Sequence, residues 1–155
     1  MADEIEVQAE VAASPSDLYA MVSDVERMGE WSPENVSCRW ADGASGPTVG
    51  ARFSGRNRRG WRRWSTVNEV VEADPGRVFA FRTSSMGLPV ARWRYTFAGD
   101  EPDGPCTVTE TWVDERGALI RVAGRLATGV ADRASHNRDG MRQTLEALKA
   151  AAERG

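Results

Sequence analysis

The sequence predicts an α+β protein in which a long amphipathic helix lies across one face of an antiparallel sheet. Three observations lead to this fold class. Residues 4–11 alternate strictly between apolar and polar side chains, residues 35–116 form short alternating segments joined by tight turns, and the last third carries apolar residues at helical spacing. A length of 155 residues with 41% hydrophobic and 28% charged residues suits one globular domain, expected over residues 1–155.

The N-terminal part predicts one strand followed by one or two short helices. The strand covers Glu4–Val11, whose odd-numbered residues are apolar. Ser14, Pro15 and Asp17 form a helix-start signal, with Ser14 as the N-cap and Pro15 in the first turn. Gly29 ends the helical pattern, whose apolar positions are Leu18, Met21, Val22, Val25 and Met28.

Six further strands are expected between residues 35 and 116. Each alternates between apolar and polar side chains, and turn-forming residues separate it from the next. The proline and glycine after Asp74 suit a type II turn. The turn signals are Asp42-Gly43, the tip Arg58-Arg59-Gly60, Asp74-Pro75-Gly76, a loop with Gly87 and Pro89, and residues 100–105. Tight connections of this kind predict an antiparallel meander.

The last third predicts one long amphipathic helix. At about 100° per residue, one stripe gathers Leu119, Val122, Ala123, Leu126, Val130, Met141, Leu145 and Leu148. Gly124, Gly129 and Gly140 each weaken a helix by about 1 kcal/mol relative to alanine. Packing against the sheet must therefore hold this helix.

Polar residues interrupt the inward-facing apolar positions. Arg133 and Asn137 project from the helix stripe, and Glu110 alternates with Val108 and Trp112 on a predicted strand. A buried polar group without a partner costs several kcal/mol. Two explanations remain open. Either Glu110 and Arg133 form a supporting ion pair or one of them points outward, or these residues line a cavity that holds water or a ligand.

Aromatic residues supply candidate walls for such a cavity. Tryptophan is the commonest aromatic, with six residues against four Phe and two Tyr. Indole rings offer a large apolar area with one donor, which suits both cores and ligand pockets. Trp93, Tyr95 and Trp112 are candidates for either role.

The sequence offers little for metal, cofactor or nucleophilic chemistry. The two cysteines, Cys38 and Cys106, lie far apart, and with one histidine no metal-ligand spacing is present, so neither metal nor cofactor is expected. A Ser-His-Asp triad would need His136, which lies at the flank of the helix stripe. The glycines of residues 42–50 lack the Gly-Lys-Ser/Thr ending of a phosphate-binding loop.

One segment is strongly basic. Between residues 56 and 64, two tryptophans stand among five arginines: Arg56, Arg58, Arg59, Arg62 and Arg63. Such a segment can bind RNA or touch an anionic membrane, or it can be a solvated hairpin tip whose charges discourage edge pairing. The net charge of −3 argues against nucleic acid and favours the solvated tip.

The sequence predicts a soluble protein of the cytoplasm. No apolar run approaches a membrane span, the acidic start does not resemble a signal peptide, and the scarce cysteines suit a reducing compartment. The choice between monomer and dimer stays open.

Three stretches together resemble the polyketide cyclase/dehydrase and lipid-transport family of the SRPBCC, or START-like, superfamily. They are AASPSDLYAMVSDVERMGEWSP, VGARFSGRNRRG and HNRDGMRQTLEALKAAAE, and they follow the family's order along nearly the whole chain. The resemblance implies a helix-grip fold, in which a curved seven-stranded antiparallel sheet wraps around a long C-terminal helix with a hydrophobic cavity between them. Two short helices follow the first strand in this fold.

The resemblance also implies a function. Proteins of this kind hold lipids, sterols, quinones, hormones or polyketide intermediates, so a binding or transport role for a hydrophobic small molecule is expected. An aromatase/cyclase or dehydratase acting on a polyketide is the alternative, with Arg133, Glu110 and Tyr95 as catalytic candidates. The cavity positions it implies are Trp31, Phe53, Trp93, Tyr95, Glu110, Trp112, Arg133, Asn137 and Met141.

Overall fold

The computed structural model describes residues 4–101, 104–117 and 133–154. Its seven strands form one antiparallel sheet in the order β1-β7-β6-β5-β4-β3-β2, so the first strand closes the meander beside the last. The strands are β1 (Glu4–Val11), β2 (Asn35–Trp40), β3 (Arg52–Arg59), β4 (Arg62–Asp74), β5 (Val78–Ser85), β6 (Leu88–Ala98) and β7 (Cys106–Asp114). The predicted seven-stranded antiparallel sheet is thereby confirmed.

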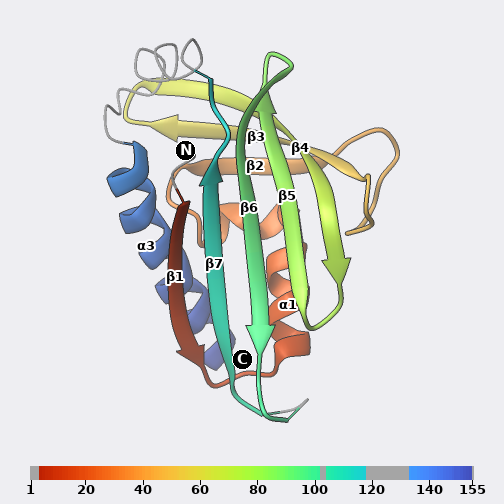
Figure 1. Cartoon of the computed structure of the whole chain (residues 1–155), viewed down its shortest axis with the longest axis vertical. Coiled ribbons are helices and arrows are strands. Elements are labelled where there is room, and N and C mark those ends of the chain that lie inside the picture. The colour runs from red at the N-terminus through yellow and green to blue at the C-terminus, as the bar shows by residue number, and fades with distance from the viewer. Residues whose placement is uncertain (1–3, 102–103, 118–132, 155) are drawn as a thin grey trace.

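Two short helices follow β1, as expected. The first is α1 (Pro15–Ser23), and the second is the 3₁₀ helix η1 (Val25–Glu30). The Ser14 side chain caps α1 by accepting a hydrogen bond from the Asp17 amide at 3.1 Å. The C-terminal helix α3 (Arg133–Arg154) lies alongside β1, whereas α1 packs behind β5 and β6 (Figure 1).

The sheet is strongly curved. In Figure 1, β1, β7, β6 and β5 stand upright, while β2 and β3 cross behind their upper ends. Register shifts interrupt the pairing at residues 35–37, 70–72 and 83–84. Bulges of this kind bend a strand and increase its twist. Because of this curvature, the sheet partly surrounds the space between its inner face and α3.

The turns predicted at Asp42-Gly43, at the tip that ends with Gly60 and at Asp74-Pro75-Gly76 are confirmed, with one difference at a strand end. Part of the turn predicted at residues 100–105 lies outside the described residues. Asp42, Gly43 and Gly76 have positive φ angles, as tight turns at these positions require. Met86 and Gly87 also have positive φ and form the β5–β6 turn. The loop expected to include Pro89 is therefore shorter, and Pro89 lies within β6.

The described part of the helix stripe faces the core. Met141, Leu145 and Leu148 on α3 are buried against the inner face of the sheet. The stripe positions Leu119, Val122, Ala123, Leu126 and Val130 lie outside the described residues. Among the described helices, none is long and apolar enough to cross a membrane.

Candidate functional site

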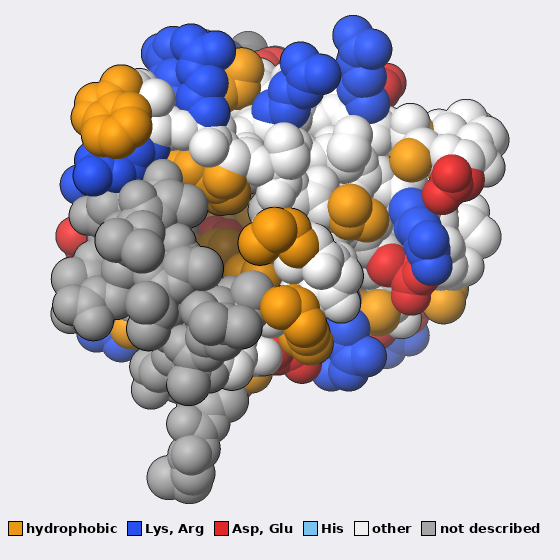
Figure 2. Space-filling model, turned by 90° about the horizontal axis from the view of Figure 1, so that it is seen from above, with side chains coloured by type: hydrophobic (Ala, Val, Ile, Leu, Met, Phe, Trp, Pro, Cys, Tyr) orange, Lys and Arg blue, Asp and Glu red, His pale blue; other side chains and the backbone are white. Residues whose placement is uncertain are grey.

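A cavity of about 260 Å³ lies between the inner face of the sheet and α3. Most of its wall surface is apolar, and the lining side chains come from β2 to β7, η1, α3 and the segments next to them. Seen from the end of the molecule where β5 turns into β6, the surface is hollowed, with hydrophobic side chains at the wall of the hollow (Figure 2). Its apolar lining residues include Met28, Phe53, Trp64, Phe81, Val90, Ala91, Trp93, Trp112 and Met141.

A buried carboxyl group faces this cavity from β7. Glu110 is 2% exposed, and its Oε2 accepts a hydrogen bond from the Tyr95 hydroxyl at 2.8 Å. The two residues stand directly opposite each other on β7 and β6. Burial raises the pKa of Glu110 to about 8, although the bond from Tyr95 lowers it. Burial also holds the pKa of Tyr95 well above its usual value.

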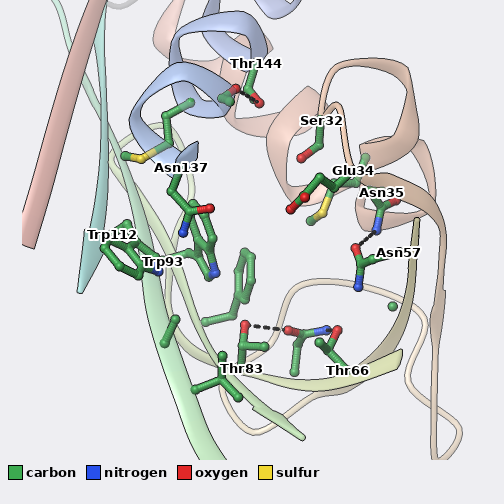
Figure 3. A pocket seen from close by; sticks show the side chains of 18 of the residues that line it. Ser32, Glu34, Asn35, Asn57, Thr66, Thr83, Trp93, Trp112, Asn137 and Thr144 are labelled. Atoms are coloured by element: carbon green, nitrogen blue, oxygen red, sulfur yellow. Dashed lines mark hydrogen bonds between the residues drawn. The ribbon is translucent and has the colours of Figure 1, made fainter. Parts of the chain in front are cut away.

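A hydrogen-bond network centred on Asn68 lines another part of the cavity wall. Asn68 on β4 is 4% exposed; its Oδ1 accepts a hydrogen bond from the Thr83 hydroxyl at 2.7 Å, and its Nδ2 donates to the Phe53 carbonyl and the Thr66 hydroxyl. These bonds link β3, β4 and β5 across the curved sheet. Figure 3 shows Thr83 and Thr66 below the cavity and Asn137 reaching toward it from α3. The network offers few unused donors to a ligand.

Charged groups gather where α3 begins in the described chain. The Glu34 carboxylate accepts a hydrogen bond from Arg133 Nη1 at 2.9 Å, and its other oxygen lies 2.9 Å from His136 Nε2. The Arg133 guanidinium also stands 5.9 Å from the centre of the Trp64 ring. Burial lowers the pKa of Arg133, and the Glu34 carboxylate partly offsets that effect. The segment before β2 is thus tied to α3 at the edge of the cavity.

A second ion pair lies beside this cluster. Arg116 donates to both carboxylate oxygens of Asp114, at 2.8 and 2.9 Å. Asp114 is buried at the end of β7, and Arg116 lines the cavity. Bidentate arginine–carboxylate pairs are strong and directional, so this pair fixes the chain where it leaves β7.

The structure brings most of the sequence-predicted site residues to this cavity. Its lining includes Phe53, Trp93, Tyr95, Glu110, Trp112, Arg133, Asn137 and Met141. Trp31 is the exception: it is buried at the end of η1, with the Arg27 guanidinium 5.1 Å from its ring centre, and it does not line the cavity. The ion pair considered between Glu110 and Arg133 is absent, because Glu110 bonds to Tyr95 and Arg133 to Glu34.

Sequence reasoning missed several polar residues of the cavity wall. Asn68 and Thr83 interrupt the inward alternation of β4 and β5, which is the same signal that marked Glu110. His136 lies at the flank of the apolar helix stripe, and in the structure its ring contacts the Glu34 carboxylate. Glu34 itself lies in the short segment between η1 and β2, where no periodicity marks it.

The basic segment forms the β3–β4 hairpin, whose tip is solvated. Trp61 at the tip is 81% exposed, and the Arg62 guanidinium lies 4.4 Å from the centre of its ring. Pairing in the hairpin sets Arg58 opposite Arg63 and Arg59 opposite Arg62. Trp64, the other tryptophan of this segment, faces the cavity instead.

Comparison with known proteins identifies the family. A family model described as polyketide cyclase/dehydrase and lipid transport matches residues 2–153. The chain belongs to this family. The Polyketide_cyc-like protein Cgl2372 from Corynebacterium glutamicum is 30% identical, with a TM-score of 0.61 over 99% of this chain and 93% of that one. No curated protein matches the chain.

Two more distant structures share the fold. A START superfamily protein from Mycobacterium smegmatis has a TM-score of 0.65 at 17% identity, over 97% of each chain. The di-domain aromatase/cyclase StfQ of the steffimycin biosynthetic pathway has a TM-score of 0.70 at 16% identity. That match covers 99% of this family member and 51% of StfQ. The predicted helix-grip fold is therefore confirmed.

Proposed function

We propose that this family member binds a hydrophobic small molecule of the lipid, polyketide or quinone type in the cavity between α3 and the sheet. The cavity is the observation that carries the proposal. Protein interiors rarely hold voids much larger than a water molecule, whereas this one measures about 260 Å³. It is slightly smaller than the usual ligand pocket, about 300–1,000 Å³, and suits a compact ligand.

The lining supports an apolar ligand with a few polar groups. The wall surface is mainly apolar, and most polar groups in it already have partners within the protein. Sites that bind small molecules combine an apolar wall with a few positioned polar atoms in this way. Binding or transport is therefore preferred to a function at the surface.

Native mass spectrometry of the protein purified from its own host tests this function directly. We expect a co-purifying mass of a few hundred daltons that organic solvent removes. A protein that is always free of ligand, and that also binds none of a panel of lipids, quinones and aromatic polyketides, would contradict the proposal.

A matched pair of variants tests the location of the ligand. Thr66 lines the cavity, whereas its neighbour Ser65 is exposed on the other face of β4. We expect Thr66→Trp to fill the cavity and weaken ligand binding at least tenfold, since the indole occupies the space of the ligand. Ser65→Trp should leave the dissociation constant unchanged. Calorimetric titration measures both, and equal affinities in the two variants would place the ligand elsewhere.

One observation favours a second function, that of a polyketide cyclase or dehydratase. Glu110 is a carboxylic acid with a raised pKa inside the cavity, which suits general acid catalysis. The Tyr95 hydroxyl already donates to Glu110, so the proton donor would be Glu110 rather than Tyr95. Turnover of a β-keto thioester, lost in Glu110→Gln while the substrate still binds, would favour this enzyme over a carrier.

A further inference from the structure

Glu110 has one carboxyl oxygen without a hydrogen-bond partner. Tyr95 donates to Oε2 at 2.8 Å, whereas Oε1 is buried and makes no hydrogen bond to any residue that the structure describes. The residue lines the cavity and is 2% exposed. Buried polar atoms in proteins are nearly always paired, so an orphan at a cavity wall indicates a partner that comes from outside the chain.

The surroundings of Glu110 favour its neutral form. Burial raises its pKa to about 8, so the carboxyl group carries a proton at neutral pH. Since Oε2 already accepts from Tyr95, the protonated oxygen is best placed at Oε1, which then becomes a donor. A carboxylic acid kept neutral by its apolar site is an established type of hydrogen-bond donor in enzymes.

We propose that Glu110 donates a hydrogen bond from Oε1 to a carbonyl oxygen of the ligand, so that the cavity selects hydrophobic molecules bearing a ketone, quinone or enone group. This inference rests on the binding function proposed above and names the chemical class of the ligand. A ligand without an acceptor would leave the donor unpaired in an apolar site, which weakens binding.

The adjacent wall suits a flat, conjugated ligand. Trp93 and Trp112 stand opposite each other on β6 and β7, two residues along each strand from the Tyr95–Glu110 pair. Because side chains alternate along a strand, all four share the inner face of the sheet. The two indole rings are 6.4 Å apart between centroids. A planar ring system can therefore contact indole faces while its carbonyl oxygen reaches Glu110.

Other titratable groups share the cavity with Glu110. Among the described residues, Tyr95 alone is within hydrogen-bond distance of its carboxyl group. β1, which pairs with β7, places Val7 opposite Glu110 and adds no charge there. The remaining groups around the cavity are Arg133 and His136 on α3, Arg116 after β7, Cys38 on β2 and Glu34 before β2.

Fluorenone and fluorene provide a matched pair of probes. They share a flat tricyclic skeleton and differ in a carbonyl group against a methylene group, and neither ionises near neutral pH. We expect wild-type protein at pH 6.5 to bind fluorenone about tenfold more tightly than fluorene, the effect of about one buried hydrogen bond. Binding of neither probe would contradict the cavity function itself, whereas equal binding of both would contradict only the role of Glu110.

Two substitutions of Glu110 separate the loss of its hydrogen bond to the ligand from a change in the shape of the cavity. Glu110→Met removes the donor at similar volume, and we expect it to abolish the preference for fluorenone. Glu110→Gln keeps an N–H donor and should retain the preference. The infrared carbonyl stretch of bound fluorenone should lie at lower frequency in wild type and Glu110→Gln than in Glu110→Met. An unchanged frequency across the three proteins would overturn the proposal.

A pH series tests the same donor in the folded wild-type protein. Ionised Glu110 cannot donate, so affinity for fluorenone should fall as the pH rises through about 8, while affinity for fluorene stays constant. Glu110→Gln should lose this pH dependence. His136→Gln should keep it, which excludes the histidine at the edge of the cavity as its source. A fluorenone affinity independent of pH between 6.5 and 9.5 would refute the proposed donor.

Discussion

Glu110 couples the ligand site to the stability of the fold. In the unfolded chain its carboxyl group has an ordinary pKa near 4.5, whereas in the folded protein the pKa is about 8. Between these values the folded state holds a proton that the unfolded state has released. Stability therefore falls as the pH rises through this window and levels off above about pH 8. Glu110 thus destabilises the protein in alkaline solution.

This linkage predicts the behaviour of Glu110→Gln, which stays neutral at every pH. Relative to wild type, the variant should gain stability between pH 5 and pH 8, by at most about 1.4 kcal/mol for each pH unit. Urea unfolding of both proteins at pH 5, 6.5 and 8 measures the difference. A constant difference would show that Glu110 ionises with an ordinary pKa in the folded state.

At the scale of the element, the β3–β4 hairpin carries local repulsion. Arg58 faces Arg63, and Arg59 faces Arg62, across the two strands. Like charges directly opposite each other destabilise an antiparallel pair, although solvent and salt screen the effect. The pairing nevertheless holds, because residues farther along β3 and β4, such as Phe53 and Asn68, are anchored in the core.

Reversing one of these charges should stabilise the hairpin. Arg63→Glu places a carboxylate opposite Arg58, and we expect a gain of about 0.2–1 kcal/mol at low salt. Arg56→Glu is the matched control, since Arg56 faces Ser65 and has no arginine directly across. Urea unfolding at low and high salt should show the gain for Arg63→Glu shrinking as salt is added. The same gain in both variants would mean that only the net charge matters.

At the scale of the whole molecule, periodicity predicted the fold because each element has one buried face. The alternation of β7 and the helical spacing of α3 set which side chains face inward, so Glu110, Asn137 and Met141 could be placed before the structure was known. Pairings between elements could not be predicted from periodicity. The partners of Glu110 and Arg133 depend on strand register and on Glu34, which lies in an irregular segment.

The free thiol of Cys38 makes cavity occupancy measurable without a label on the ligand. Cys38 lines the cavity, whereas Cys106, also buried and free, does not. Burial raises the pKa of the Cys38 thiol, so alkylation should be slow, and a bound molecule should slow it further. Mass spectrometry of the two cysteine peptides after timed alkylation, with and without fluorenone, measures this protection. Cys106 serves as the internal reference. Equal slowing of alkylation at both cysteines would mean that the ligand stabilises the whole fold rather than covering Cys38.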